Sequence, residues 1–405
     1  MTKLTEDIKI QKIALLIACA SALQILESLI PHPIPGVRLG LANMITVVAL
    51  VNLGFKASLE IAILRTIISS FIMGTFLSPT FILSFSGAVT STIVMGIIFR
   101  LSTLNRKVYF SLVGISLMGA FTHNIVQISL VYLLLIKHKG IFLLLPWLGI
   151  SAVVMGWITG LVASQVCRKL ETISVRKDLE ELVGITSAPF SSRNYVQSDS
   201  SIHLLHPILK ISFVFILAVA VLILNNFIVY SIILIFLIIV IQISRIPILN
   251  IFSRIRKLSV FLFFSFIIPV LLSRNGEILV DLGFLQITQE GLLMGFTFVF
   301  RIVLLMLSAT LMMMTTSPEE LASGLKKLLS PFEIIGVSGD RVSTIITASI
   351  SYIPDSLKRV HHFIKLQKFS GKTFRRLIPA LSDLIVVLYQ QADEQTEETR
   401  KNIEI

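Results

Sequence analysis

Polar side chains inside otherwise apolar stretches are the residues of this sequence that could do chemistry. In the first half of the chain they are Asn43, Glu60, Arg65, His123, Asn124 and Gln127. Burying such groups in lipid is costly unless they face a partner or a cavity. His123, Asn124 and Gln127 fall within one helical turn and therefore share a helix face. We expect these three, with Asn43, to bind a small-molecule substrate. The alternative is hydrogen bonding between helices, with Glu60 and Arg65 paired locally.

Motifs for catalysis, metal binding or nucleotide hydrolysis do not stand out in the sequence. Ser370-Gly371-Lys372-Thr373 ends like a phosphate-binding loop, but Leu366 stands where that motif needs its first glycine. The two cysteines, Cys19 and Cys167, lie at or within apolar stretches, which predicts neither a disulfide framework nor a metal site. The sequence therefore predicts no catalytic residue, no metal and no cofactor.

The composition is typical of a membrane protein. Hydrophobic residues make up 55% of the chain, charged residues make up 14%, and the mean hydropathy is +0.89. Long apolar runs recur without the alternation of barrel strands, which predicts an all-α, polytopic membrane protein with about ten transmembrane helices. The formal net charge of +12 is expected to lie in cytoplasmic loops beside anionic lipid, and not to bind nucleic acid.

The apolar runs divide the chain into two membrane parts. Residues 1–170 hold six predicted spans, at 13–30, 38–54, 57–77, 80–100, 109–136 and 141–166. A polar linker at 171–202 leads to residues 203–405, whose four predicted spans are 208–224, 227–244, 258–273 and 291–315. Lys and Arg concentrate in alternate loops, which predicts a cell-membrane protein with a cytoplasmic N-terminus and a cytoplasmic C-terminus.

The chain changes character after residue 315, where cytoplasmic amphipathic helices are predicted within 317–400. Ser317 is a good helix N-cap, Pro318 suits the first helical position, and Glu320 can complete a capping box. One apolar stripe follows at helical spacing: Ile346, Ile350, Ile353, Leu357, Val360 and Ile364. A second amphipathic run extends from Phe374 to Leu388, and the polar tail from Ala392 to Ile405 is expected to fray.

The first 168 residues resemble the Gx transporter family, which is related to the substrate-binding S components of energy-coupling factor transporters. The matching stretches are Glu27 to Pro31, Pro35 to Asn43, and His123-Asn124 with Gln127. On the first predicted span, Ala14, Ala18 and Ala22 form a small-xxx-small series, which favours close helix packing. This series resembles the alanine motif by which S components dock on their transmembrane partner. The resemblance implies a six-helix domain that docks through these alanines.

Residues 203–400 resemble that partner, the T component. The resemblance is carried by His206-Pro207-Ile208-Leu209-Lys210, by Arg301 and by Thr315 to Leu321. It implies coupling to separate ABC-type ATPase chains, and the residues we assign to this coupling are Ser317, Glu320, Lys365, Lys368, Arg375 and Arg376. T components end their coupling helices with Ala-Arg-Gly-type triplets. The corresponding stretches here, Gln367 to Gly371 and Ala392 to Arg400, keep neither triplet intact.

Together, the two resemblances predict a fused S and T subunit of an importer for a vitamin-like or precursor molecule. Gx-type sequences also carry the label heptaprenyl diphosphate synthase component I, so a membrane component of polyprenyl diphosphate synthesis is the main alternative. The sequence lacks the aspartate-rich clusters that hold magnesium and a prenyl diphosphate. A third hypothesis is a membrane assembly factor that does not transport.

Overall fold

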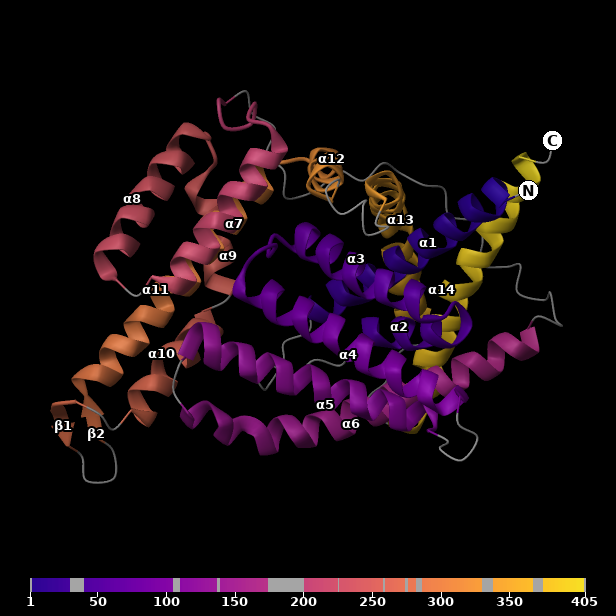
Figure 1. The fold of residues 1–405 in the computed structure, drawn as a ribbon, viewed down its shortest axis with the longest axis horizontal. Coiled ribbons are helices and arrows are strands. Elements are labelled where there is room, and N and C mark those ends of the chain that lie inside the picture. The colour runs from indigo at the N-terminus through magenta and orange to yellow at the C-terminus, as the bar shows by residue number, and fades with distance from the viewer. Residues whose placement is uncertain are drawn as a thin grey trace.

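The fold is seen in a computed structural model that describes residues 2–29, 40–104, 110–136, 139–173, 200–224, 226–257, 259–273, 276–281, 286–329, 338–366 and 374–403. Within these ranges the chain is almost entirely helical (Figure 1). Five helical segments are long and apolar enough to cross a membrane, and three shorter helices are also apolar. The predicted all-α, polytopic membrane fold is therefore confirmed, while the count of about ten spans stays a prediction.

The first half of the chain folds into a bundle of helices that match the six predicted spans. They are α1 (Thr2–Leu29), α2 (Leu41–Asn52), α3 (Phe55–Met73), α4 (Pro79–Leu104), α5 (Leu112–Leu130) and α6 (Leu145–Ile173). A π-helical turn at Val131–Ile136 continues α5, and a 3-10 turn at Lys139–Leu144 precedes α6. Neighbouring helices from α3 to α6 pack side by side, and α1 and α2 close the bundle against α3 and α6.

The second half is organised around one long helix, α11 (Gln289–Thr315). Around it pack α7 (Pro207–Ile223), α8 (Phe227–Ile243), α9 (Ile248–Lys257) and α10 (Ser259–Leu272). Two elements here were not predicted. The basic loop after α8 contains the amphipathic helix α9, which buries Ile251. An antiparallel hairpin of β1 (Ile278–Asp281) and β2 (Gln286–Thr288) lies between α10 and α11.

Polar residues start several of these helices by satisfying free backbone amides. The hydroxyl of Ser111 accepts from the amide of Gly114 at α5, and the hydroxyl of Thr288 accepts from the amide of Gly291 at α11. At α7, His206 Nδ1 accepts from the amide of Ile208. These local contacts explain why the helices begin close to the predicted positions.

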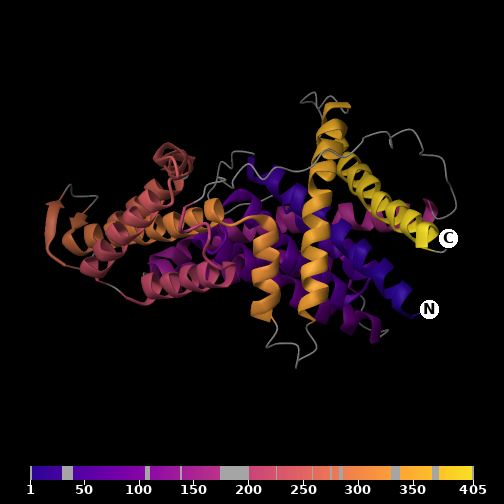
Figure 2. The same cartoon turned by 90° about the horizontal axis from the view of Figure 1, so that it is seen from above.

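The C-terminal helices lie across the first half of the chain. They are α12 (Pro318–Leu329), α13 (Gly339–Leu366) and α14 (Phe374–Ile403). Figure 2 shows α12 and α13 standing side by side, with α14 running back toward the N-terminus. The tail beyond Ala392 was expected to fray, and this expectation is wrong as far as Ile403, because α14 continues to that residue. Ala392 is fully buried, and Asp393 pairs with Lys12 of α1.

One apolar core joins the two halves. Its buried members include Leu15 and Val48 from the first half, and Ile346, Ile353 and Leu388 from the second. Ile346 and Ile353 belong to the predicted stripe, so that stripe is used for packing against the bundle. Figure 1 shows the same arrangement, with α13 and α14 beside α1.

Candidate functional site

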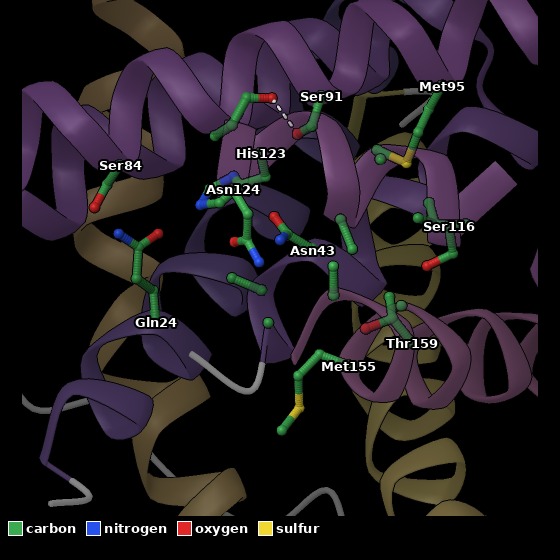
Figure 3. A pocket seen from close by; sticks show the side chains of 18 of the residues that line it. Gln24, Asn43, Ser84, Ser91, Met95, Ser116, His123, Asn124, Met155 and Thr159 are labelled. Atoms are coloured by element: carbon green, nitrogen blue, oxygen red, sulfur yellow. Dashed lines mark hydrogen bonds between the residues drawn. The ribbon is translucent and has the colours of Figure 1, made fainter. Parts of the chain in front are cut away.

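A polar cavity lies inside the bundle of α1 to α6. Its volume is about 80 Å³, and every one of the six helices contributes lining residues. Figure 3 shows Asn43, His123 and Asn124 grouped together, with Gln24 and Ser84 to one side. Such a concave site with a few convergent polar groups is the usual form of a small-molecule site.

Three of the four residues predicted to bind substrate meet in this cavity. They are Asn43 from α2 and His123 and Asn124 from α5. Gln127, one turn further along α5, is not among the described lining residues. Gln127 thus shares the predicted helix face without being one of the lining residues.

His123 and Asn124 also have packing roles. Asn124 Nδ2 donates to the carbonyl of Leu148 at 2.8 Å and to Ser151 Oγ at 3.2 Å, which ties α5 to α6. The ring of His123 lies against Gly87 of α4, where a Cβ atom would come within 2.7 Å of ring atoms. Asn124 thus lines the cavity and also makes the interhelical hydrogen bonds of the alternative hypothesis, while its role in substrate binding stays a prediction.

Arg65 is the charged residue of α3 in the cavity wall, and only 4% of it is exposed. Its Nη1 donates to Gln24 Oε1 at 2.9 Å, and its Nη2 donates to Asn43 Oδ1. The alternative of a local pair between Glu60 and Arg65 is therefore wrong. Glu60 instead accepts from Arg341 of α13, at 3.3 Å from Nε and 3.2 Å from Nη2.

Glu27 and Gln24 are lining residues that the sequence analysis did not select. Glu27 Oε1 accepts from the amide of Gly40 at 2.8 Å, and Oε2 accepts from the amide of Leu41 at 3.1 Å. The carboxylate therefore caps the N-terminal end of α2, where negative charge is favourable. Both residues lie within the last turns of α1, and their polarity inside an apolar span was the signal that could have found them.

The alanine series lies on α1, the helix that packs against α13 and α14. Ala14, Ala18 and Ala22 are fully buried. They share a stripe of α1 with Gln11, whose Nε2 donates to the hydroxyl of Tyr352 on α13 at 3.5 Å. The neighbouring Cys19 Sγ lies 3.6 Å from Ser356 Oγ, also on α13. Residues next to the series on α1 thus contact α13.

Polar contacts surround this apolar contact between α1 and the C-terminal helices. In the described part of the chain, three ion pairs join the halves: Lys12 with Asp393, Lys169 with Asp383, and Arg341 with Glu60. Lys12 Nζ also lies 4.9 Å from the ring centre of Tyr389. Burial, more than the nearby Asp393, raises the pKa of Tyr389, so its ring stays neutral beside the lysine.

The residues assigned to energy coupling are placed as follows. The Ser317 amide donates to Glu320 Oε2 at 3.0 Å and the Glu320 amide donates to Ser317 Oγ at 3.2 Å, which confirms the predicted capping box. Lys365 is exposed near the end of α13. Arg375 and Arg376 lie in the first turn of α14, and Lys368 lies outside the described residues.

Two family models match the chain, one in each half. Residues 16–166 match the family described as heptaprenyl diphosphate synthase component I, and residues 198–399 match the family described as cobalt transport protein. The energy-coupling factor transporter transmembrane protein EcfT of Listeria innocua is 28% identical over 49% of this chain and 79% of its own length. The EcfT proteins of Macrococcus caseolyticus and Bacillus subtilis are each 26% identical, over 82% and 79% of their lengths.

These similarities, on a bundle of apolar helices, define a multi-pass membrane component of an energy-coupling factor transporter, which is a transport protein and not an enzyme. The C-terminal half is a T-component domain of that class. The synthase-component model covers the region that resembles the Gx family, and this region contains the cavity.

Proposed function

We propose that this chain fuses the substrate-capturing and energy-transducing membrane parts of an energy-coupling factor importer. The observation that carries the proposal is the packing of α1 on α13 and α14. This packing brings the cavity bundle into direct contact with the helices that would transmit movement from ATPase chains. In the proposed function, Ala14, Ala18 and Ala22 form the docking surface, since small residues let helices approach closely.

The cavity is the proposed substrate site, and a vitamin-like or precursor molecule is the proposed cargo. Ligand sites for such molecules usually enclose ~300–1,000 Å³. The observed cavity of about 80 Å³ is smaller. In our proposal the docked arrangement is therefore the unloaded one, and the bundle widens when it takes up substrate from outside the cell.

The ATPases would be separate chains that contact the cytoplasmic side of α13 and α14, where we assign Lys365, Lys368, Arg375 and Arg376 to the contact. Both chain ends are proposed to be cytoplasmic. The pairing of Lys12 with Asp393 supports this, because it holds the first and last helices together on one side of the molecule (Figure 1).

Affinity purification of the tagged full chain from its native membrane tests the proposal. We expect two ATPase chains to co-elute and to be identified by mass spectrometry. Co-elution of a prenyl diphosphate synthase would instead support the function named by the matched N-terminal family. Recovery of neither, with no uptake of any solute by the reconstituted chain, would favour the assembly factor and overturn the transport proposal.

A further inference from the structure

Building on the proposed import function, we propose that the cavity binds its cargo through an uncharged group that presents a carbonyl beside an N–H, as in an amide or a lactam. Ser116 and Thr159 bind this group together with Asn43. Neither hydroxyl stood out in the sequence, because small residues are enriched wherever membrane helices pack. The packing of α5 on α6, the hydrogen bonding of the three side chains and the charges of the cavity wall all support this assignment.

Two glycines bring α5 and α6 close together beside these hydroxyls. A Cβ atom on Gly156 would lie 2.9 Å from Leu117 Cα, and one on Gly160 would lie 2.5 Å from another backbone atom of α5. Because a backbone cannot give way like a side chain, these positions suit glycine, the smallest residue. Thr159 directly precedes Gly160, and Ser116 directly precedes Leu117. The close packing therefore brings the two hydroxyl side chains to neighbouring positions in the cavity wall.

The hydroxyl groups of Ser116 and Thr159 are available to a ligand. Both residues line the cavity, and they are only 3% and 4% exposed. Within the described part of the chain, neither hydroxyl has a hydrogen-bond partner. The lining hydroxyl of Ser91 differs, because it donates to the carbonyl of Ala88 at 3.1 Å. A hydroxyl can donate and accept, and a buried polar group without a partner is costly, so a ligand that bonds both would stabilise them.

Asn43 supplies a donor beside these hydroxyls. Its Oδ1 accepts from Arg65, which turns its Nδ2 the other way. Among the described residues, this Nδ2 has no acceptor. A Cβ atom on Gly40 would lie 3.5 Å from Asn43 Nδ2 and 3.7 Å from Thr159 Oγ1, so these two atoms lie close to each other. Figure 3 shows Ser116 and Thr159 on the same side of Asn43. The three groups thus form one set of donors and acceptors.

The charges of the wall favour an uncharged ligand group. Among the described lining residues, the carboxylate of Glu27 and the guanidinium of Arg65 have opposite signs, so together they add no net charge. Glu27 accepts from the amide of Gly40, the residue next to Asn43 Nδ2 and Thr159 Oγ1. A ligand carboxylate on these groups would lie near a like charge, which is unfavourable. A ligand ammonium offers only donors and could not pair with the Nδ2 donor.

An amide or a lactam matches the three groups. Its carbonyl oxygen can accept from Asn43 Nδ2 and from one hydroxyl, and its N–H can donate to the oxygen of the other hydroxyl. The group is flat and small, so it suits a cavity of about 80 Å³, and the remainder of the molecule would enter as the bundle widens. Met95 and Met155 of the wall offer adaptable apolar contacts to that remainder.

The test uses the purified full chain in lipid nanodiscs, with its co-purifying subunits. The probe is a small-molecule extract of whole cells, from which retained compounds are eluted and identified by mass spectrometry. We compare the native chain with Ser116→Ala and Thr159→Val, which each remove one hydroxyl, and with Thr159→Ser, which keeps it. Ser164→Ala in α6 and Thr122→Val in α5 are the matched controls. Their hydroxyls donate to carbonyls of their own helices at 2.7 and 2.8 Å, and neither is among the described lining residues.

We expect the native chain to retain a compound that contains an amide or a lactam. Retention should fall by about 5- to 150-fold in Ser116→Ala and in Thr159→Val, and should stay within about twofold in Thr159→Ser and in both controls. A retained compound without such a group, or unchanged retention by Ser116→Ala and Thr159→Val, would overturn this inference and leave the import function standing. Equal losses in the control variants would also overturn it, because the hydroxyls would then act through the fold. Retention of no compound at all would count against both.

Discussion

Lys210 is a buried cation that ties several elements of the C-terminal half together. It is 6% exposed, and its Nζ donates to the carbonyls of His203 at 2.9 Å and Thr315 at 2.6 Å. Thr315 ends α11, and the C-terminal end of a helix favours a nearby cation. The same Nζ lies 3.9 Å from Glu320, which closes the capping box of α12. One side chain therefore contacts both the end of α11 and the start of α12.

Replacing this lysine should destabilise the fold strongly. Lys210→Met leaves two buried carbonyls without their donor, and we expect the free energy of unfolding to fall by about 2–5 kcal/mol. The measurement is unfolding of the purified chain in detergent. Lys326→Met is the control, because Lys326 forms an exposed pair with Asp340 and its loss should cost less than about 0.5 kcal/mol. Equal losses in the two variants would contradict the structural role of Lys210.

The cavity residues should differ in their effect on substrate affinity. Asn43→Ala removes one polar group from the wall, and we expect affinity to fall by about 5- to 150-fold, the equivalent of ~1–3 kcal/mol. Gln127→Ala removes an amide from α5 outside the described lining and should leave the affinity within about twofold. Calorimetric titration of each purified variant with a compound that co-purifies with the native chain measures both affinities. A larger loss in Gln127→Ala would restore Gln127 to the site.

The elements that cross between the halves differ in the strength of their polar contacts. Arg341 of α13 makes two hydrogen bonds to Glu60 of α3, and both side chains are less than one third exposed. Lys169 of α6 pairs with Asp383 of α14, and both of these are more than one third exposed. Exposed pairs lose most of their energy to solvent and to side-chain entropy.

Two double-mutant cycles should show that these two ion pairs differ in coupling energy. For Glu60→Ala and Arg341→Ala we expect a coupling energy of about 1 kcal/mol, because the pair is bidentate and partly buried. For Lys169→Ala and Asp383→Ala the coupling should stay below about 0.5 kcal/mol. Unfolding free energies of the single and double variants provide both numbers. The reverse order would mean that α14, and not α13, holds the main polar contact with the bundle.

Sequence reasoning predicted the local features of these elements and missed the distant ones. The capping box of Ser317 and Glu320 was predictable because all of its atoms lie within four residues. The partner of Glu60 lies 281 positions away, and no periodicity in one sequence links the two. Where α14 continues past Ala392, Asp393 pairs with Lys12 of α1, a contact between distant residues that only the tertiary fold reveals. Within the cavity, residue type alone selected Asn43 and His123, whereas the tertiary packing shows that Gln127 is not among the described lining residues.

At the scale of the whole molecule, we predict that the length of the linker limits how far the two halves can separate. The predicted linker covers residues 171–202, and positions 174–199 lie outside the described residues. In general, a flexible chain of about thirty residues would span on the order of 30 Å, which is comparable to the membrane core. At its end, Ser200 Oγ is 2.6 Å from His203 Nδ1, so the linker joins a fixed turn before α7.

Shortening the linker should stop transport and spare binding. We expect a chain without residues 178–197 to retain substrate but to lose uptake, because the cavity bundle could no longer reorient while tethered. Uptake into proteoliposomes that contain the co-purified ATPases measures this. A Gly/Ser segment of the original length should restore uptake. This control distinguishes the effect of linker length from the effect of linker sequence. Normal transport by the shortened chain would mean that no large tethered motion occurs.

The packing of α1 on the C-terminal helices also affects whether a free membrane protein could bind those same helices. Ala14, Ala18 and Ala22 are buried on α1, the helix that packs on α13 and α14, and the stripe of α13 with Ile346 and Ile353 is buried in the shared core. Tethering raises the effective concentration of a binding module to about the millimolar range. A free membrane protein with a similar alanine series would have to compete with that concentration for the same stripe. If the chain is the fused importer subunit proposed above, its C-terminal helices would be occupied by its own cavity bundle, and the fused domain would determine the cargo without exchange among free subunits.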